Sequence, residues 1–200
     1  VTSALTHFAD GCLQRSLRFA LLDAQGRGRL RQLDSDYPER GTGLFFVAMG
    51  KYGAHELNYS SDIDFSCYFD TARLPVAPGV EPRELAVRLT QASVGLMQEV
   101  TQDGYVFRCD LRLRPDAGST QIAVSTIAAE QYYETKGQNW ERAAMIKARA
   151  IAGDIEAGRG FLAELSPFIW RKYLDFAAIA DIHAMKRQIH AFKGFGEIGV

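Results

Sequence analysis

The sequence has few of the residues that build covalent or zinc-stabilised scaffolds. It contains three cysteines among 200 residues, Cys12, Cys67 and Cys109. Their spacing fits neither a zinc site nor a disulfide framework, and an odd number of unpaired thiols is typical of a reducing compartment. We therefore expect a cytoplasmic protein.

The sequence also lacks an excess of charge of either sign. Its 23 Lys and Arg residues are set against 24 Asp and Glu residues, which gives a formal net charge of −1. Without a general positive field to attract a nucleic-acid backbone, any binding of anions must be local. We expect no nucleic-acid partner.

Long apolar runs and terminal signals are absent too. No stretch approaches the roughly 18 apolar residues of a transmembrane helix, and the start, VTSALTHFADG, lacks the basic head of a signal peptide. We expect neither a membrane partner nor export. Because the sequence begins without Met and has no tail composition at either end, we expect it to be a fragment of a longer protein.

The pattern of apolar residues predicts an α+β fold with a small sheet flanked by helices. Helical spacing is found over 2–26, over 83–102, and from about 127 to the end. Three stretches have the composition or alternation of strands: LFFVAMG (44–50), DIDFSCYFD (62–70) and YVFRCDLRLRP (105–115). We therefore predict a catalytic core over 1–125 and a helical extension over 126–200, with a helical tail at the C-terminus.

The stretch DIDF places two carboxylates where a buried strand is expected. Alternation along the strand turns Asp62 and Asp64 to one face and Ile63 and Phe65 to the other. Burying two like charges without partners costs several kcal/mol, so a divalent cation is the expected compensation. An isolated Asp-x-Asp is more often a solvent-facing pair, and the metal hypothesis depends on the residues around it.

A third carboxylate is predicted on the polar face of the strand 105–115. Alternation there puts Asp110 on the same face as Arg112 and Arg114. Three carboxylates on neighbouring strands can hold the metal ions of a phosphoryl-transfer site, and planar guanidinium groups can bind phosphate oxygens. For Arg108 we favour a structural ion pair.

The turn before the Asp-x-Asp stretch supplies further candidates for binding a phosphate chain. Gly50 ends the first predicted strand and allows close backbone approach, and Lys51 follows it as a point charge. Ser60 and Ser61 precede Asp62 with hydroxyl and amide groups. The combination with three aspartates predicts a site for a metal ion and a nucleotide.

The stretch MGKYGAHELNYSSDIDF resembles the nucleotidyltransferases of the DNA polymerase β superfamily, in which a glycine turn is followed some ten residues later by Asp-x-Asp. Lys51 stands where that superfamily usually has Gly or Ser, which points to a narrower group, the glutamine synthetase adenylyltransferase family. The stretches DGYVFRCDLRLRPDAGS and YYETKGQNWERAAMIKARAIAGD look like that family's next two blocks, so the resemblance covers about residues 43–195.

The resemblance implies a polymerase β-like nucleotidyltransferase fold with a small mixed sheet. It also implies Mg²⁺ or Mn²⁺ held by Asp62, Asp64 and Asp110. Family members carry two such domains, an N-terminal one that removes AMP from glutamine synthetase and a C-terminal one that attaches it. ELNYSSDID, RCDLRLRP and GQNWERAAMIKAR are more similar to the removing half.

The function that the resemblance implies is phosphorolysis. Inorganic phosphate attacks the phosphorus of a tyrosyl-AMP ester of adenylylated glutamine synthetase, which gives ADP and the free tyrosine, under regulation by the PII signal protein in nitrogen assimilation. Two alternatives remain open: the adenylylating half, which uses ATP, and a regulatory module that binds nucleotide without catalysis. In the removing half Asp110 is expected mainly as the third metal ligand.

Overall fold

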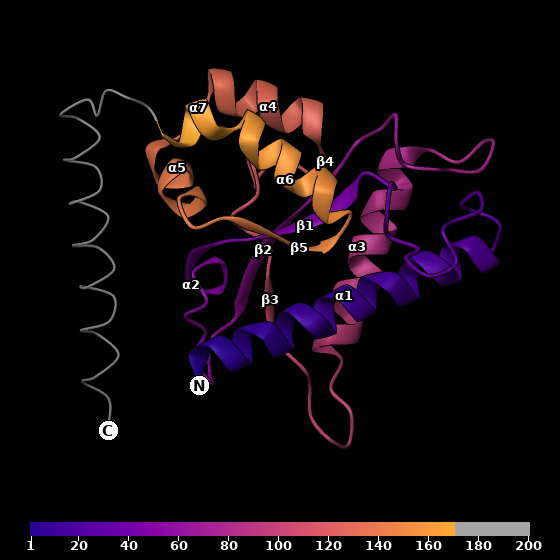
Figure 1. Cartoon of the computed structure of the whole chain (residues 1–200), viewed down its shortest axis with the longest axis horizontal. Coiled ribbons are helices and arrows are strands. Elements are labelled where there is room, and N and C mark those ends of the chain that lie inside the picture. Colours follow the sequence, from indigo (N-terminus) through magenta and orange to yellow (C-terminus); the bar gives the residue numbers. More distant parts are fainter. Residues whose placement is uncertain (171–200) are drawn as a thin grey trace.

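The computed structural model describes residues 1–170, in which a sheet lies between two layers of helices (Figure 1). The helical tail predicted at the C-terminus lies outside the described residues from residue 171 onward. The strands are β1 (Leu44–Ala48), β2 (Ile63–Phe69), β3 (Cys109–Asp110), β4 (Ala123–Ser125) and β5 (Arg149–Gly153). The helices are α1 (Thr2–Gly26), α2 (Gly50–Gly53), α3 (Pro82–Gln98), α4 (Thr126–Thr135), α5 (Asn139–Met145), α6 (Ile155–Glu164) and α7 (Ser166–Ile169).

The sheet is mixed, with the strand order β3-β2-β1-β5. β3 pairs with residues 63–64 of β2, and β4 pairs with residues 67–69 of the same strand. β1 is antiparallel to β2 and to β5, whereas β3 and β4 run parallel to β2. The prediction of an α+β fold with a small mixed sheet flanked by helices is confirmed.

Alternation along the two central strands builds one core on each face of the sheet. Ile63 and Phe65 of β2 join Phe46 of β1 in the core under α1 and α3. Phe45 of β1 and Tyr68 of β2 turn to the other face, where the α4 to α7 helices cover them. β1 is buried along its whole length because both of its faces are covered.

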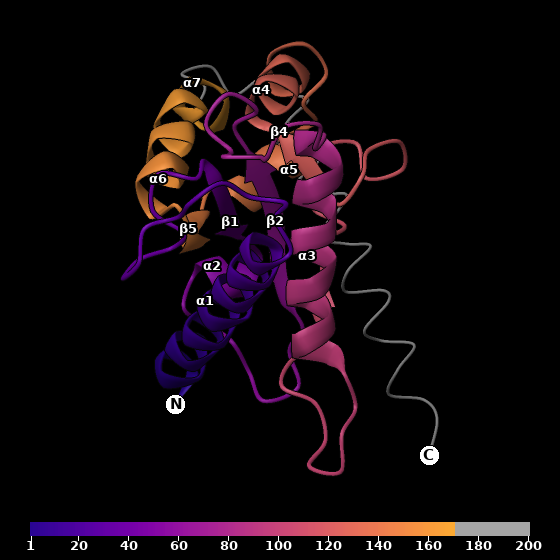
Figure 2. The ribbon, with the colours of Figure 1, turned by 90° about the vertical axis from the view of Figure 1, so that its right-hand side faces the viewer.

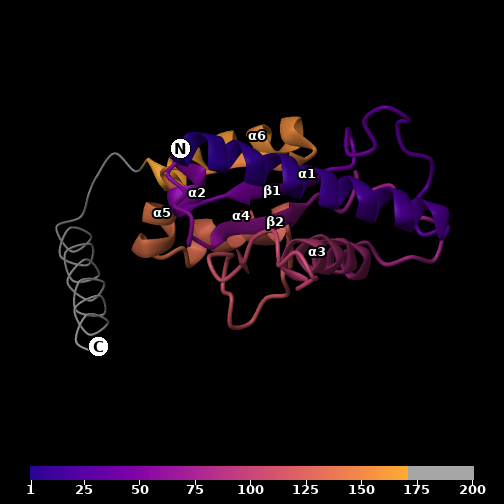
Figure 3. The same ribbon diagram turned by 90° about the horizontal axis from the view of Figure 1, so that it is seen from below.

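The two helices of the first layer lie side by side across the sheet (Figure 2). Seen from below, α1 runs along much of the length of the described part (Figure 3). Its buried residues recur at helical spacing, and four of them are Ala9, Leu13, Leu17 and Leu21. None of the helices within residues 1–170 is long and apolar enough to cross a membrane.

Two predicted elements are wrong. The strand predicted over 105–115 is only two residues long, because the chain folds back after α3, where Met97 O accepts from the amides of Val106 and Phe107. Leu113 consequently packs into the core opposite to that of Phe107. The stretch 149–153, predicted as helix, is strand β5, whose pairing with β1 overrides its local helical pattern.

β5 brings part of the predicted helical extension into the sheet itself. The strand β4, which sequence reasoning missed, is only three residues long and pairs with the end of β2. Short strands of this kind have too few alternating residues to give a period-2 signal. The division into a core over 1–125 and an extension stays a prediction.

Candidate active site

Two of the predicted carboxylates lie opposite each other in the sheet. The register of the parallel strands β2 and β3 pairs Asp64 with Asp110. Gly50, at the start of α2, lies against this pair with a positive φ of 54°, and a Cβ added there would be 3.4 Å from Asp64 Oδ2. Met49 N donates to Asp64 O at 2.9 Å, which ties the glycine turn to the strand.

Negative charge is concentrated at Asp64. Burial and the neighbouring carboxylates of Asp110 and Asp62 together raise the pKa of Asp64 to about 6, against the lowering effect of Arg112 and Lys51. Four predicted site residues thus act electrostatically on Asp64 at this end of the sheet. The sequence-based prediction that they are near neighbours is in agreement with this geometry.

Asp62 is turned toward an arginine. Arg108 Nε donates to Asp62 Oδ1 at 2.5 Å, and its Nη2 donates to the main-chain oxygen of Ser60 at 2.7 Å. The structural ion pair predicted for Arg108 is therefore present. Sequence reasoning missed that its partner is one of the site carboxylates, because the pair joins residues 46 positions apart.

Asp110 is neutralised by the arginine that follows it. Arg112 donates to Asp110 through its main-chain amide at 2.8 Å and through Nε at 2.9 and 3.0 Å. This pairing lowers the pKa of Asp110. The side chain of Arg112 is 84% exposed, so it can move toward a phosphate without losing packing.

The two serines belong to the turn that leads into β2. Ser61 Oγ accepts from Asn58 N at 3.2 Å, and Ser61 N donates to Asn58 O at 3.1 Å. Ser60 contributes its carbonyl oxygen to Arg108. In this arrangement the hydroxyl of Ser61 stabilises the turn, and its role in phosphate binding stays a prediction.

Arg114 does not share a strand face with Asp110, because β3 ends at Asp110. Its guanidinium donates to four main-chain carbonyl oxygens at 2.8–3.0 Å, those of Leu111, Ala117, Thr120 and Gln121. Burial lowers the pKa of Arg114. The contacts assign this side chain to holding the loop over 111–121 in shape.

An open cavity of about 420 Å³ lies beside the carboxylates. Asp62, Asp110 and three arginines line it, together with Gln98, Cys109 and Leu111; the arginines are Arg108, Arg112 and Arg114. A nucleotide phosphate chain needs a concave surface with cationic donors of this kind. The cavity is consistent with the predicted phosphate site.

The carboxylates have the right chemistry for a metal ion but are not gathered around one. Within residues 1–170, no group of three or more His, Cys, Asp or Glu side chains is arranged to hold one. The carboxylates of Asp62 and Asp110 are paired instead with Arg108 and Arg112. The donors themselves fit a hard cation, because carboxylate oxygens are the ligands that Mg²⁺ prefers and their mutual repulsion favours a cation between them.

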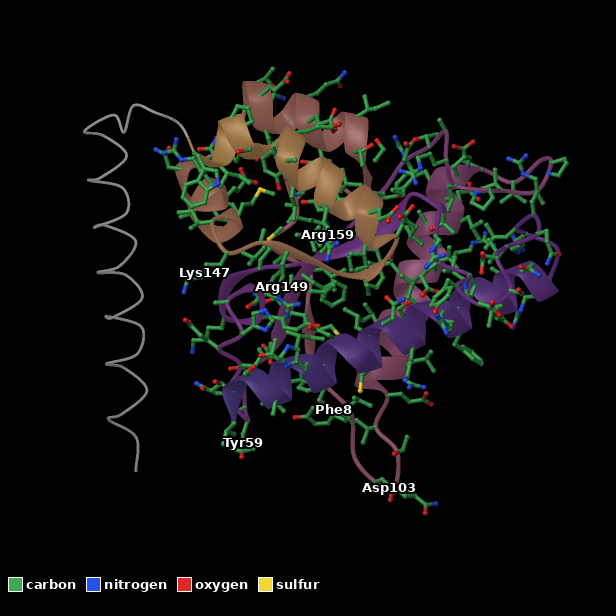
Figure 4. The ribbon with its side chains drawn as sticks, viewed as in Figure 1. Phe8, Tyr59, Asp103, Lys147, Arg149 and Arg159 are labelled. Atoms are coloured by element: carbon green, nitrogen blue, oxygen red, sulfur yellow. The ribbon has the colours of Figure 1, made fainter. Side chains whose placement is uncertain are left out.

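Sequence reasoning missed the residues that anchor the glycine turn. Arg149 of β5 donates to the main-chain oxygens of Tyr52 and Gly53 in α2, and pairs with Asp10 of α1. Lys147 lies beside it at the same end of the sheet (Figure 4), where it pairs with Glu56 at 3.2 Å. Both basic residues lie in the quoted stretch GQNWERAAMIKAR, which was the available signal.

Comparison with known proteins agrees with the geometry. The family model described as glutamate-ammonia ligase adenylyltransferase matches residues 1–164. The chain belongs to the glutamate-ammonia ligase adenylyltransferase family. The family resemblance inferred from the motifs is thereby confirmed.

Members of the adenylyltransferase family from several bacteria are similar over the whole chain. Identity is 57% over 200 residues with a protein of Bradyrhizobium sp. strain BTAi1 and 58% over 200 residues with one of Xanthobacter autotrophicus strain Py2. Each is named "Bifunctional glutamine synthetase adenylyltransferase/adenylyl-removing enzyme". The chain spans 20% of the length of these curated relatives.

Proposed function

We propose that this chain is the nucleotidyltransferase unit that removes AMP from a tyrosine of adenylylated glutamine synthetase, with inorganic phosphate as the attacking group and ADP as a product. The observation that carries the proposal is the placement of Asp64 opposite Asp110, beside the exposed cationic group of Arg112. The relatives' name, which includes an adenylyl-removing activity, supports it. The motifs ELNYSSDID, RCDLRLRP and GQNWERAAMIKAR favour the removing half over the attaching half.

The three carboxylates of Asp62, Asp64 and Asp110 would hold Mg²⁺ or Mn²⁺. When bound, the cation supplies neutralisation of the charge on the phosphoryl oxygens and on the leaving oxygen. Loading requires the side chains of Asp62 and Asp110 to leave their arginines. Arg112 is then free to act on an incoming anion.

The chain's own cationic groups would bind and orient the phosphate. Arg112 and Lys51 lie close enough to Asp64 to lower its pKa, and both are exposed to the solvent from which phosphate arrives. An oxygen of inorganic phosphate attacks the phosphorus of the AMP group, the bond from phosphorus to the tyrosine oxygen breaks, and the attacking phosphate becomes the terminal phosphate of ADP. Because phosphate is already anionic at neutral pH, a general base is not needed.

The leaving tyrosine oxygen has to take up a proton, because the pKa of a tyrosine hydroxyl is about 10. The proton comes either from a water molecule or from the attacking phosphate, which loses a proton as it becomes part of ADP. We propose that the Gly50 main-chain amide and the Ser61 hydroxyl, which accepts from Asn58 N and keeps its own hydrogen to donate, contact phosphate oxygens in this step. The close approach of Gly50 to Asp64 supports that placement.

We further propose that the unit works in the cytoplasm as part of a longer two-domain enzyme that responds to the PII signal protein. The greater length of the relatives supports the longer enzyme. The free thiols of Cys12, Cys67 and Cys109 support a reducing compartment.

The test is release of ADP from fully adenylylated glutamine synthetase with Mg²⁺ and inorganic phosphate. The parent chain is expected to release ADP only when phosphate is present, and Asp64→Asn is expected to release none. If both chains are inactive, ATP and unmodified glutamine synthetase are added, because formation of pyrophosphate would identify the attaching half instead. The same assay on the full-length Bradyrhizobium relative, with and without the equivalent aspartate changed, provides the comparison. Activity of the unchanged relative would show that an inactive fragment lacks necessary parts and that the assignment is right.

A further inference from the structure

The pair formed by Arg108 and Asp62 lies at the point where β2 and β3 begin to run together. The main chain of residue 108 is fixed there, because Ile63 N donates to Arg108 O at 2.9 Å. From this fixed point the guanidinium reaches Asp62 Oδ1 through Nε and the carbonyl of Ser60 through Nη2. It therefore holds both a site carboxylate and the turn before it.

The pair is easily opened. The side chains of Arg108 and Asp62 are 54% and 44% exposed, and ion pairs in such surroundings are weak and screened by salt. A divalent cation carries twice the charge of the guanidinium and binds carboxylate oxygens directly. The same oxygen of Asp62 cannot serve both partners at full strength.

We propose that Arg108 is a positioning residue that holds Asp62 while the divalent cation is absent and is displaced when the cation binds. The inference rests on the proposed function, since it takes Asp62 as a ligand of the cation. It assigns to Arg108 a role that the structural ion pair alone does not: it sets the concentration of cation at which the site assembles.

Displacement from Asp62 would also leave the guanidinium of Arg108 free beside the predicted phosphate site. Arg108 lines the same 420 Å³ cavity as Arg112. Once Asp62 has turned to the cation, the freed donors of Arg108 face that cavity and are available to phosphate oxygens. Arrival of the cation and preparation of the anion site are thereby linked through one side chain.

The first experiment measures the binding of Mn²⁺ to the metal-free chain by electron paramagnetic resonance of the free ion, without substrate. Arg108→Gln is expected to tighten the apparent dissociation constant about 2- to 5-fold at low salt, because a competing exposed ion pair is removed. The matched control is the same substitution in an Asp62→Asn background, in which nothing is left to compete for. There the effect of Arg108→Gln is expected to vanish.

Each other result overturns the proposal. Equal tightening in both backgrounds would mean that Arg108 acts only as a nearby positive charge, and no change or weaker binding would mean that it does not compete. A parent chain that binds no Mn²⁺ would refute the metal site of the proposed function as well, which distinguishes the two failures.

A second measurement is independent of the background variant. The Nε–H resonance of Arg108, assigned by its loss in Arg108→Gln, is followed during titration with Mg²⁺. We expect it to move to the position of a free arginine as the cation binds, whereas a resonance that stays in place would show that the pair remains closed and would refute the displacement.

Discussion

Asp64 and Asp110 lie directly opposite one another on two parallel strands, and their carboxyl groups differ in the direction of their pKa shifts. Burial and the neighbouring carboxylates raise the pKa of Asp64 to about 6. The hydrogen bonds from Arg112 lower the pKa of Asp110. One carboxylate of the pair is therefore already neutralised within the protein, and the other is the point at which added positive charge would be most favourable.

The first prediction is that Asp64→Asn makes the metal-free chain more stable at about pH 7.5. The raised pKa means that the folded state binds more protons than the unfolded state between about pH 4 and pH 6, so ionisation of Asp64 costs stability as the pH rises through this window. After discounting for partial exposure we expect a gain of roughly 1–2 kcal/mol in the free energy of unfolding. Urea unfolding in the presence of a chelator measures it.

Two controls test this prediction: the pH dependence of the stability gain, and a matched variant at Asp110. The gain should shrink as the pH falls from about 6 toward 4 and disappear below about pH 3, where Asp64 is protonated in both states. Asp110→Asn should show no such gain, because the pKa of Asp110 is lowered and its carboxylate favours the folded state. A loss of stability in Asp64→Asn at pH 7.5 would contradict the assignment of the shift to burial and repulsion.

The alternation of β2 could be predicted from the sequence, and with it the face of Asp64. Seven consecutive residues from Ile63 to Phe69 give a clear period of two, and both of the faces that it predicts are found in the structure. The same holds for α1, whose long apolar stripe fixes both its type and its buried face. Long elements with one dominant period are the part of the fold that local sequence determines.

The surroundings of Arg114 could not be predicted in this way. Alternation over 105–115 looked like a strand, but the backbone carbonyls of the loop over 111–121 find their donor in the guanidinium of Arg114 and not in a neighbouring strand. The partner of Arg108 and the strand β5 were missed for a related reason. Each depends on a contact between segments far apart in the sequence, which no local period records.

The second prediction concerns the ion pair between Asp10 of α1 and Arg149 of β5. Its two hydrogen bonds measure 2.8 and 2.9 Å, and the side chains are mostly buried. Asp10→Ala leaves a largely buried guanidinium without its carboxylate, so we expect a loss of about 2–4 kcal/mol in the free energy of unfolding. The control is Asp23→Ala, which removes an exposed pair between this residue of α1 and Arg27, just after the helix, and should cost about 0–1 kcal/mol. Equal losses would contradict an anchoring role.

The third prediction tests the close packing of the glycine turn. A Cβ at Gly53 would lie 2.3 Å from the main-chain oxygen of Lys147 and 3.0 Å from that of Ala48, and neither backbone atom can move aside without shifting its strand or loop. We expect Gly53→Ala to cost roughly 1–3 kcal/mol, measured by thermal unfolding. Gly11→Ala is the control, because Gly11 lies in α1 with nothing within 4 Å, and alanine should there gain about 0.5–1 kcal/mol. A neutral Gly53→Ala would refute the close approach.

The last prediction separates the two arginines that follow Asp110. Because Arg114 donates from three nitrogens to four carbonyl oxygens, an ammonium group cannot replace its planar fork. Arg114→Lys should therefore cost roughly 1–3 kcal/mol and speed hydrogen exchange of the amides over 111–121, even without substrate. Arg112→Lys should leave that exchange unchanged, since the side-chain hydrogen bonds of Arg112 go to Asp110 and not to a carbonyl oxygen of the loop.

The affinity for inorganic phosphate gives the other half of this comparison. If Arg112 binds the phosphate and Arg114 shapes the loop, Arg112→Gln should raise the KM for phosphate and leave the free energy of unfolding nearly unchanged. The reason is that the side chain of Arg112 is exposed and packs against little. Arg114→Lys keeps the charge at its position, so its effect on KM should follow the loosening of the loop and diminish at low temperature. A raised KM for Arg114→Lys with unchanged hydrogen exchange would instead make Arg114 a direct phosphate ligand.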